Sequence, residues 1–174
     1  MTTRRDLLQG VGVLGLGAAA GALAADAPVA DPPPRSNCIF CRIAAGDAPA
    51  TVVHRDARCV AFATIEPLEP GHLLLAPRGH VRDIYDLSPD LGAHLFGVAT
   101  GLARAMREVF KPDGLTLRQN TGDAGGQTVF HFHIHLVPRF AGRELWRLVT
   151  PPVRRAPAEL DAVFAPLADA LRGR

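Results

Sequence analysis

The chain has 174 residues, 48% of them hydrophobic, which suits one globular domain with a substantial core. Its formal net charge is only +2, and the basic residues are scattered along the chain. So small a charge excludes a strongly basic nucleic-acid-binding surface, and we expect no nucleic acid partner.

The first 24 residues have the pattern of a twin-arginine export signal. Arg4 and Arg5 precede a mildly hydrophobic stretch, and Ala22-Leu23-Ala24 offers the small residues that signal peptidase requires. The alternative is an uncleaved membrane anchor, but a stretch rich in Gly and Ala anchors weakly. We therefore expect cleavage after Ala24, a periplasmic protein and no stable membrane insertion. Residues 25–36 are rich in proline and predict an extended linker.

The folded part is predicted to combine short strands with one long helix. Strands are expected at 51–54, 59–64, 72–76, 115–120 and 128–137, where β-branched and aromatic residues lie between turn residues. Ser88 and Pro89 predict the start of a helix whose apolar spacing runs to Phe110. A further helix is expected over 156–172, kinked or split by Pro166. This mixture indicates an α+β domain.

Three histidines, His131, His133 and His135, alternate with apolar residues in the last predicted strand. Side chains alternate between the two faces of a strand, so the three imidazoles should line one face. Imidazole can be a nucleophile, an acid or base near neutral pH, or a metal ligand. Neighbours two residues apart on a straight strand seldom converge on one ion. We therefore expect the row to be divided between metal binding and chemistry.

A glycine-rich loop directly precedes this histidine row. Gly125 and Gly126 let backbone N–H groups approach an anion closely. The amide of Gln127 and the hydroxyl of Thr128 can both bond a phosphate oxygen. A neutral imidazole beside such donors is arranged for attack on phosphorus.

Cys38 and Cys41 form a C-x-x-C pair, which alone is ambiguous among zinc, a disulfide and thiol redox chemistry. Export favours a disulfide, because the periplasm is oxidising. Cys59 lies in a strand pattern and is expected to be a small buried residue. The sequence indicates no partner for His54 or His94.

The segment Gly126–Val137, GQTVFHFHIHLV, resembles the signature of the histidine-triad (HIT) superfamily of nucleotide hydrolases and transferases. The resemblance extends over most of residues 37–140, including Gly71–His80 and Asn120–Gly122. It implies a homodimer, with an antiparallel sheet of about five strands, a long helix and a C-terminal helix in each subunit. On this basis the HIT domain spans residues 37–142, and residues 143–174 form a C-terminal extension.

The resemblance also implies roles for individual residues. His133 would attack the α-phosphorus of a nucleotide and form a nucleotidyl-histidine, which water then hydrolyses. The other residues that the resemblance places in catalysis or nucleotide binding are His72, Thr64, Ile65, Asn120, Gly126, Gln127, Thr128 and His135. Of these, His135 would bond phosphate oxygens and Gln127 would orient the phosphate and leaving group. Thr64 stands where the family often has an Asp that binds both ribose hydroxyls.

Zinc-containing bacterial members imply that His80 and His131 complete a Cys₂His₂ site with the cysteine pair. That zinc would be structural, because protein ligands fill all four positions. The implied substrate is a purine-type nucleotide, either a nucleoside phosphoramidate or a dinucleoside polyphosphate. Two alternatives remain: a zinc-stabilised nucleotide-binding protein with little turnover, which Thr64 suggests, and a thiol–disulfide protein using Cys38 and Cys41.

Overall fold

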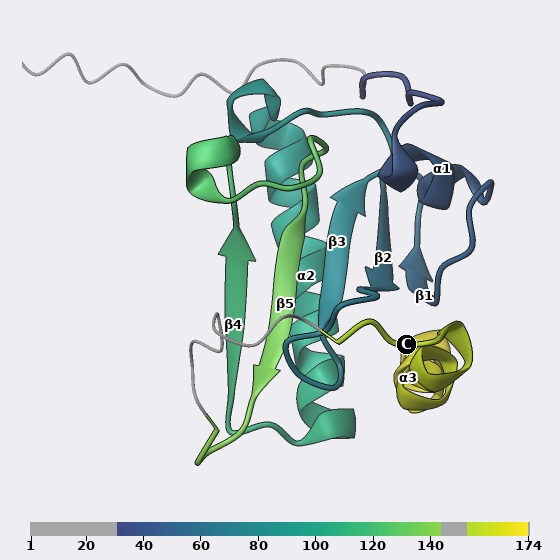
Figure 1. Ribbon diagram of the computed structural model, residues 1–174, viewed down its shortest axis with the longest axis vertical. Coiled ribbons are helices and arrows are strands. Elements are labelled where there is room, and N and C mark those ends of the chain that lie inside the picture. The colour runs from purple at the N-terminus through teal and green to yellow at the C-terminus, as the bar shows by residue number, and fades with distance from the viewer. Residues whose placement is uncertain (1–30, 144–152, 174) are drawn as a thin grey trace, which may run out of the picture.

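The computed structural model describes residues 31–143 and 153–173. These residues form a five-stranded antiparallel sheet with a long helix and a C-terminal helix, as predicted (Figure 1). The predicted export signal and the first part of the predicted linker lie outside the described residues. Within those ranges, no helix is both long and apolar enough to cross a membrane.

The sheet has the spatial order β1-β2-β3-β5-β4, and every neighbouring pair is antiparallel. Its strands are β1 (Val52–Arg55), β2 (Cys59–Ala63), β3 (Leu73–Pro77), β4 (Gly114–Gln119) and β5 (Ile134–Arg139). The helices are α1 (Ile39–Ala45), α2 (Pro89–Phe110) and α3 (Pro157–Arg172), with short 3₁₀ helices η1 (Ile84–Asp86) and η2 (Asp123–Gly125). This order places β5 between two partner strands.

Both faces of the central strands are buried, because helices cover each face. Leu73 and Leu75 of β3 pack into the larger core with α2, whereas Leu74 and Ala76 pack into a smaller core with α1. In Figure 1, α2 lies behind the sheet and α1 beside the upper ends of β1 and β2. The continuous apolar runs of β2 and β3 follow from this double burial.

The start and end of α2 are as predicted. The Ser88 hydroxyl accepts a hydrogen bond from the Leu91 N–H at 3.3 Å, and Pro89 is the first helical residue. Lys111 follows the helix with a φ of 47°, and its N–H bonds the Arg107 carbonyl. In α3, by contrast, Pro166 does not split the helix, because Phe164 and Leu167 on either side of it are held in the larger core.

The last strand is shorter than predicted: β5 begins at Ile134, whereas a strand was expected from Thr128. Its partner β4 ends at Gln119, which pairs with Ile134, and the pairing with β3 stops at the same residue, although β3 continues to Pro77. Instead the N–H of Phe132 bonds the carbonyl of Val81, in the loop after β3. The alternation survives nonetheless, since Phe132 and Ile134 both enter the larger core.

The end of the predicted linker is docked on the domain. The Asp31 carboxylate pairs with the Arg58 guanidinium at 2.8 and 2.9 Å. The Pro33 carbonyl accepts a hydrogen bond from the His80 N–H at 3.2 Å. A Cβ on Gly79 would lie only 2.0 Å from the carbonyl oxygen of Pro32, so glycine allows this close approach. The segment from Asp31 onward is therefore part of the packed structure.

Candidate functional site

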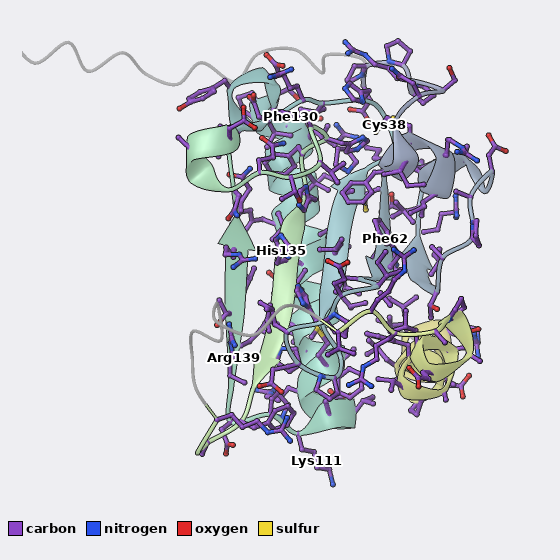
Figure 2. All side chains as sticks on the ribbon, in the orientation of Figure 1. Cys38, Phe62, Lys111, Phe130, His135 and Arg139 are labelled. Carbon is purple, nitrogen blue, oxygen red and sulfur yellow. The ribbon has the colours of Figure 1, made fainter. Side chains whose placement is uncertain are left out.

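The three histidines of the row lie on the face of the sheet that α1 covers. The ring centroids of His133 and His135 are 5.0 Å apart. The Phe40 ring of α1 stands edge-on to His131 at 5.8 Å and to His133 at 5.2 Å. His131 and His133 are buried, whereas His135 is partly exposed over the middle of the sheet (Figure 2). The row is therefore open to solvent at its His135 end.

The backbone holds His133 in one tautomer. Its Nδ1 lies 2.7 Å from the carbonyl oxygen of His131, so Nδ1 carries the proton and donates it. Nε2 then keeps a free lone pair, which is the state that a nucleophile needs. Burial lowers the pKa of His133, and this keeps the ring neutral at physiological pH. Its Nε2 can therefore form a bond to phosphorus.

A chain of hydrogen bonds fixes the tautomer of His135. The backbone N–H of Leu68 donates to Nδ1 of His72 at 3.1 Å, so the proton of His72 resides on Nε2. That Nε2–H donates to Nδ1 of His135, 2.9 Å away. The proton of His135 must then lie on its own Nε2. The backbone N–H of Leu68 thus fixes the tautomer of His72, and His72 fixes that of His135. The Nε2–H of His135 is left free to donate to a ligand.

Burial keeps this histidine pair neutral. It lowers the pKa of His72 to about 3, with a further contribution from the charge of Arg118. Burial likewise lowers the pKa of His135 to about 3, and neighbouring His72 adds to the effect. Both rings therefore act as hydrogen-bonding groups rather than as cations at physiological pH.

Arg118, which the sequence reasoning did not single out, places a positive charge beside the histidine row. It pairs directly with His135 across β4 and β5, and such pairs share a face of the sheet. Its Nε is buried and has no hydrogen-bond partner among the described residues. An unpaired buried guanidinium nitrogen beside the histidines is suited to an anion. Only the strand register reveals this placement, so the sequence carried no signal for it.

The Gln127 amide is fully engaged within its loop. Its Nε2 donates to the carbonyl oxygens of Arg82 at 2.8 Å and Val129 at 3.1 Å. Its Oε1 accepts a hydrogen bond from the N–H of Gly122 at 2.9 Å. Both amide hydrogens are therefore used, and in this conformation Gln127 shapes the glycine loop rather than offering a donor to a phosphate.

The other loop residues leave one polar group available. The Asn120 Nδ2 donates to the carbonyl of Gly126 at 3.0 Å, which closes the loop against the end of β4. Gly126 has a φ of 79°, a conformation that glycine adopts without strain. Thr128 is exposed, and its hydroxyl has no hydrogen-bond partner within the described part of the chain. That hydroxyl can therefore bind a phosphate oxygen.

The predicted ribose segment lies where β2 ends, next to His72. The Thr64 N–H bonds the His72 carbonyl at 3.3 Å, and the Thr64 hydroxyl accepts from the Glu66 N–H at 3.3 Å. The carbonyl of Ile65 accepts a hydrogen bond from the backbone N–H of Arg155 at 2.8 Å. Arg155 of the C-terminal extension thus lies beside the predicted nucleotide segment, a contact that the sequence did not predict.

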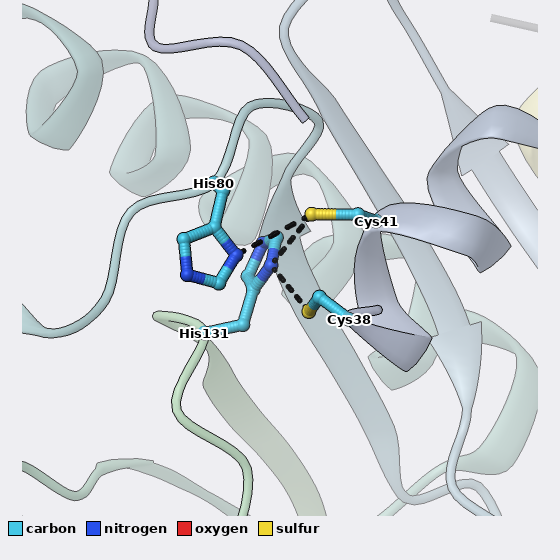
Figure 3. A group of neighbouring side chains, drawn as sticks. All are labelled: Cys38, Cys41, His80 and His131. Carbon is cyan, nitrogen blue, oxygen red and sulfur yellow. Dashed lines mark hydrogen bonds between the residues drawn. The ribbon is translucent and has the colours of Figure 1, made fainter. Parts of the chain in front are cut away.

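Cys38, Cys41, His80 and His131 converge on one point, as Figure 3 shows. Cys38 is the N-cap of α1 and Cys41 lies in its first turn, so a spacing of three residues puts both thiols on one side. Nδ1 of His131 is 3.3 Å from the Cys38 Sγ and 3.4 Å from the Cys41 Sγ, and Nδ1 of His80 is 3.5 Å from the Cys41 Sγ. Ligands of a tetrahedral zinc ion lie about 3.5 Å apart, so this spacing fits a metal ion.

The tautomers also fit metal binding. Nε2 of His131 donates to the carbonyl of Pro77 at 2.9 Å, which leaves the Nδ1 lone pair facing the two thiols. Burial lowers the pKa of His131 to about 4 and also lowers that of His80, so both rings stay neutral. Burial raises the pKa of the Cys41 thiol, and a cation would be needed to make it a thiolate. These four residues could hold a metal ion.

Comparison with known proteins agrees with this geometry. A HIT domain model matches residues 45–142. Protein hit of Bacillus subtilis (strain 168) is 40% identical over 104 residues, which cover 60% of this chain and 72% of that protein. Adenylylsulfatase HINT3 of Arabidopsis thaliana is 29% identical over 138 residues, which cover 79% of this chain and 69% of that protein.

One solved structure of similar fold belongs to a zinc-bound protein. A zinc-bound histidine triad family protein from Mycobacterium smegmatis is similar with a TM-score of 0.70 and 36% identity. The similarity covers 79% of this chain and 94% of that one. The fold of the present chain therefore has a relative in which zinc is bound, and its own Cys/His cluster could hold such an ion.

Proposed function

This chain belongs to the HIT domain family, and from that premise we propose that it hydrolyses or transfers the nucleotidyl group of a purine nucleotide through a covalent intermediate on His133. One observation carries the proposal: Nδ1 of His133 is committed to the His131 carbonyl, so Nε2 is the free nucleophilic atom. The buried, neutral state of the ring supports the same role.

The reaction proceeds in two displacements at the α-phosphorus. In the first, the Nε2 lone pair of His133 bonds to phosphorus, and the leaving group departs with the electrons of its own bond to phosphorus. In the second, water bonds to phosphorus and loses a proton to solvent, while the nitrogen–phosphorus bond breaks and returns the lone pair to Nε2. An acceptor nucleophile in place of water makes the same chemistry a transfer.

Neighbouring groups bind and orient the phosphate. The Nε2–H of His135 donates to a phosphate oxygen, and the Thr128 hydroxyl and the loop N–H groups near Gly126 add further donors. His72 acts as a positioning residue, because its hydrogen bond at 2.9 Å determines which nitrogen of His135 carries the proton. The Arg118 guanidinium supplies positive charge beside the same anion.

The substrate class is an adenylyl group joined to a leaving group. The name of the Arabidopsis relative, an adenylylsulfatase, supports sulfate as one leaving group. An amine or a second nucleotide are the others that we consider. The unpaired Nε of Arg118 beside the row favours an anionic leaving group, since a guanidinium binds sulfate or phosphate through charge-assisted hydrogen bonds.

Zinc at Cys38, Cys41, His80 and His131 is part of the proposal. Bound there, it supplies a structural tie and no catalytic water, because protein atoms fill the four positions. It competes with a disulfide between the cysteines, both of which are free in this structure. Homodimerisation and twin-arginine export of the chain likewise remain predictions. Subunit number in solution and fractionation of a tagged precursor test them.

The function is tested with adenosine phosphoramidate, adenylyl sulfate and a diadenosine polyphosphate as substrates. We expect the wild type to turn over at least one of them and His133→Ala to lose that activity. Rapid quenching and peptide mass spectrometry should find the adenylyl adduct on His133. Arg104→Ala, on the exposed side of α2, is the control.

Two outcomes would count against the proposal. Equal rates for the wild type and His133→Ala would remove His133 from the mechanism. Tight nucleotide binding with neither turnover nor adduct would favour the second candidate, a nucleotide-binding protein. Thr64 favours that candidate, since its hydroxyl is a poorer bidentate acceptor for ribose than a carboxylate.

A further inference from the structure

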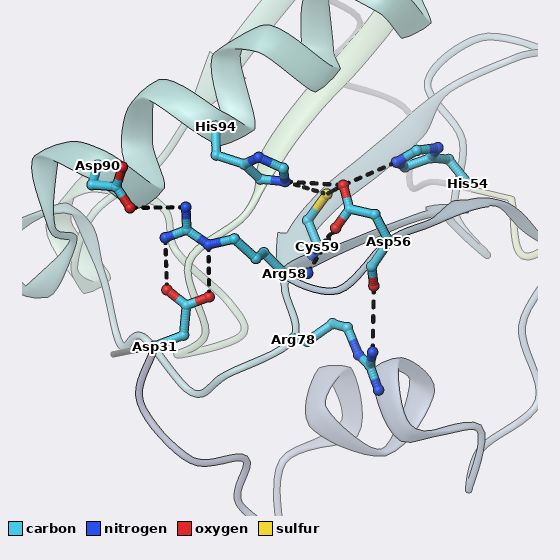
Figure 4. Close-up of polar contacts among 8 residues, drawn as sticks. All are labelled: Asp31, His54, Asp56, Arg58, Cys59, Arg78, Asp90 and His94. Carbon is cyan, nitrogen blue, oxygen red and sulfur yellow. Dashed lines mark hydrogen bonds and ion pairs between the residues drawn. The ribbon is translucent and has the colours of Figure 1, made fainter. Parts of the chain in front are cut away.

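A second cluster of metal-binding side chains lies on the other face of the sheet, against α2 (Figure 4). His54 comes from β1, Asp56 from the turn after it, Cys59 from the start of β2, and His94 from α2. The sequence indicated no partner for His54 or His94. The fold brings both, together with Cys59, onto the carboxylate of Asp56.

The donor atoms of His54, Asp56 and Cys59 all lie within 4.8 Å of one another, and His94 approaches Asp56 and Cys59. Oδ2 of Asp56 lies 2.9 Å from Nε2 of His94, 3.3 Å from Nε2 of His54 and 3.3 Å from Sγ of Cys59. Sγ of Cys59 is also 3.8 Å from Nε2 of His94. Donor atoms of a tetrahedral zinc ion lie about 3.5 Å apart. The group formed by His54, Asp56 and Cys59 meets a looser form of this spacing, and His94 adds its own close approaches to Asp56 and Cys59.

Hydrogen bonding alone does not account for this convergence. Oδ1 of Asp56 accepts from the backbone N–H groups of Arg58 and Cys59, each at 2.7 Å, and so forms the turn between β1 and β2. Oδ2 is approached by two imidazole nitrogens and a thiol, although one carboxylate oxygen has two lone pairs. Oδ2 can therefore accept hydrogen bonds from only two of these three donors. A bound cation would remove the shortage, because all three groups would then act as its ligands.

We propose that this cluster binds a divalent transition-metal ion such as Zn²⁺, at a site separate from the Cys₂His₂ centre. The ligands are His54, Asp56, Cys59 and His94. Two imidazoles, a carboxylate and a thiolate are all ligand types that zinc accepts. Binding replaces the proton of the Cys59 thiol, which leaves to solvent as the sulfur–metal bond forms.

The surroundings allow an ion to enter and be held. The side chains of His54, Asp56 and His94 are 30%, 28% and 30% exposed, whereas Cys59 is fully buried. An ion would therefore enter between the partly exposed ligands and meet the thiolate at the inner end. The nearby guanidinium of Arg58 does not compete, because it points away and pairs with Asp31 and Asp90 (Figure 4).

A metal here would tie the β1–β2 hairpin to α2. Cys59 belongs to the larger core with α2, whereas Cys38 packs against the smaller core with α1, so the sheet separates the two centres. The second ion would stabilise the fold without contacting the histidine row. Its effect should consequently appear in metal content and thermal stability rather than in substrate turnover.

The test is the zinc content of the tag-free, full-length chain after equilibration with buffered Zn²⁺. We expect two equivalents in the wild type and one in His94→Gln and in Cys59→Ala. Arg104→Gln, an exposed substitution on the same helix, is the matched control and should keep two. Cys38→Ser should lose the other equivalent and retain this one, which separates the two centres.

A stability measurement guards against loss of metal through misfolding. Excess Zn²⁺ should raise the thermal midpoint of Cys38→Ser but not that of Cys38→Ser combined with His94→Gln, because only an ion bound to the native state stabilises it. The proposal is overturned if His94→Gln and Cys59→Ala both contain as much zinc as the wild type. Equal zinc-induced shifts in the two Cys38→Ser chains would overturn it independently.

Discussion

Replacing His72 by phenylalanine keeps a ring at a site that is 2% exposed, but removes the donor that fixes the tautomer of His135. Without that donor, Nδ1 of His135 can hold the proton itself, and Nε2 no longer donates to the phosphate. Loss of such a buried hydrogen bond costs about 1–3 kcal/mol. If that cost falls on the transition state, kcat/KM drops by about 5- to 150-fold. We expect the loss mainly in kcat, because the bond orients a reacting group.

Steady-state hydrolysis of adenosine phosphoramidate measures this effect. Leu75→Met, three residues further along in β3 and in the core against α2, controls for a buried substitution. His72→Gln keeps an N–H donor at similar reach and should recover part of the lost rate. If His72→Phe folds and keeps the kcat/KM of the wild type, the hydrogen bond from His72 does not determine the tautomer of His135.

Three further predictions concern the same face of the sheet. Arg118→Gln should slow turnover of adenylyl sulfate more than that of adenosine phosphoramidate; equal losses would remove Arg118 from leaving-group binding. Thr64→Asp should tighten AMP binding roughly 10- to 150-fold, since a hydrogen bond to a charged group adds about 1.5–3 kcal/mol; an unchanged Kd by calorimetry would place the ribose elsewhere. Acid should destabilise the fold, because burial lowers the pKa values of His72 and His135 to about 3, below the ordinary 6.5. As pH falls through this window the unfolded chain binds protons that the native chain does not, so each histidine removes about 1.4 kcal/mol per pH unit; a flat urea-denaturation profile from about pH 7 to about pH 5 would contradict this.

Local signals in the sequence predicted the regular elements well. Ser88 and Pro89 define the start of α2 through a side-chain cap and a fixed φ, and both act within one turn of the helix. The alternation of His131, His133 and His135 likewise predicted their common face, because it depends only on the extended backbone. Features that depend on neighbours along the chain could therefore be predicted from the sequence alone.

The features that sequence reasoning missed depend on strand register and distant loops. The strand from Thr128 was predicted too long, because β4 stops at Gln119 and the N–H of Phe132 bonds the Val81 carbonyl in the loop after β3 instead of joining the sheet. His54 in β1 and His94 in α2 both contact Asp56, which lies in the turn after β1. No spacing in the sequence reveals that these two histidines meet. Gln127 stays predicted as a phosphate ligand; its present hydrogen bonds to the carbonyls of Arg82 and Val129 also depend on a distant loop and could not be read from the sequence.

His131 connects the metal centre to the proposed nucleophile through its two ends. Its Nδ1 faces the thiols of Cys38 and Cys41, and its Nε2 is tied to the Pro77 carbonyl. Its own carbonyl accepts a hydrogen bond from the Nδ1–H of His133, and that bond leaves Nε2 of His133 free. Any ion that fixes the His131 ring therefore also restrains the backbone oxygen that sets the tautomer of His133. The metal centre can thus support catalysis while remaining outside every bond that is made or broken.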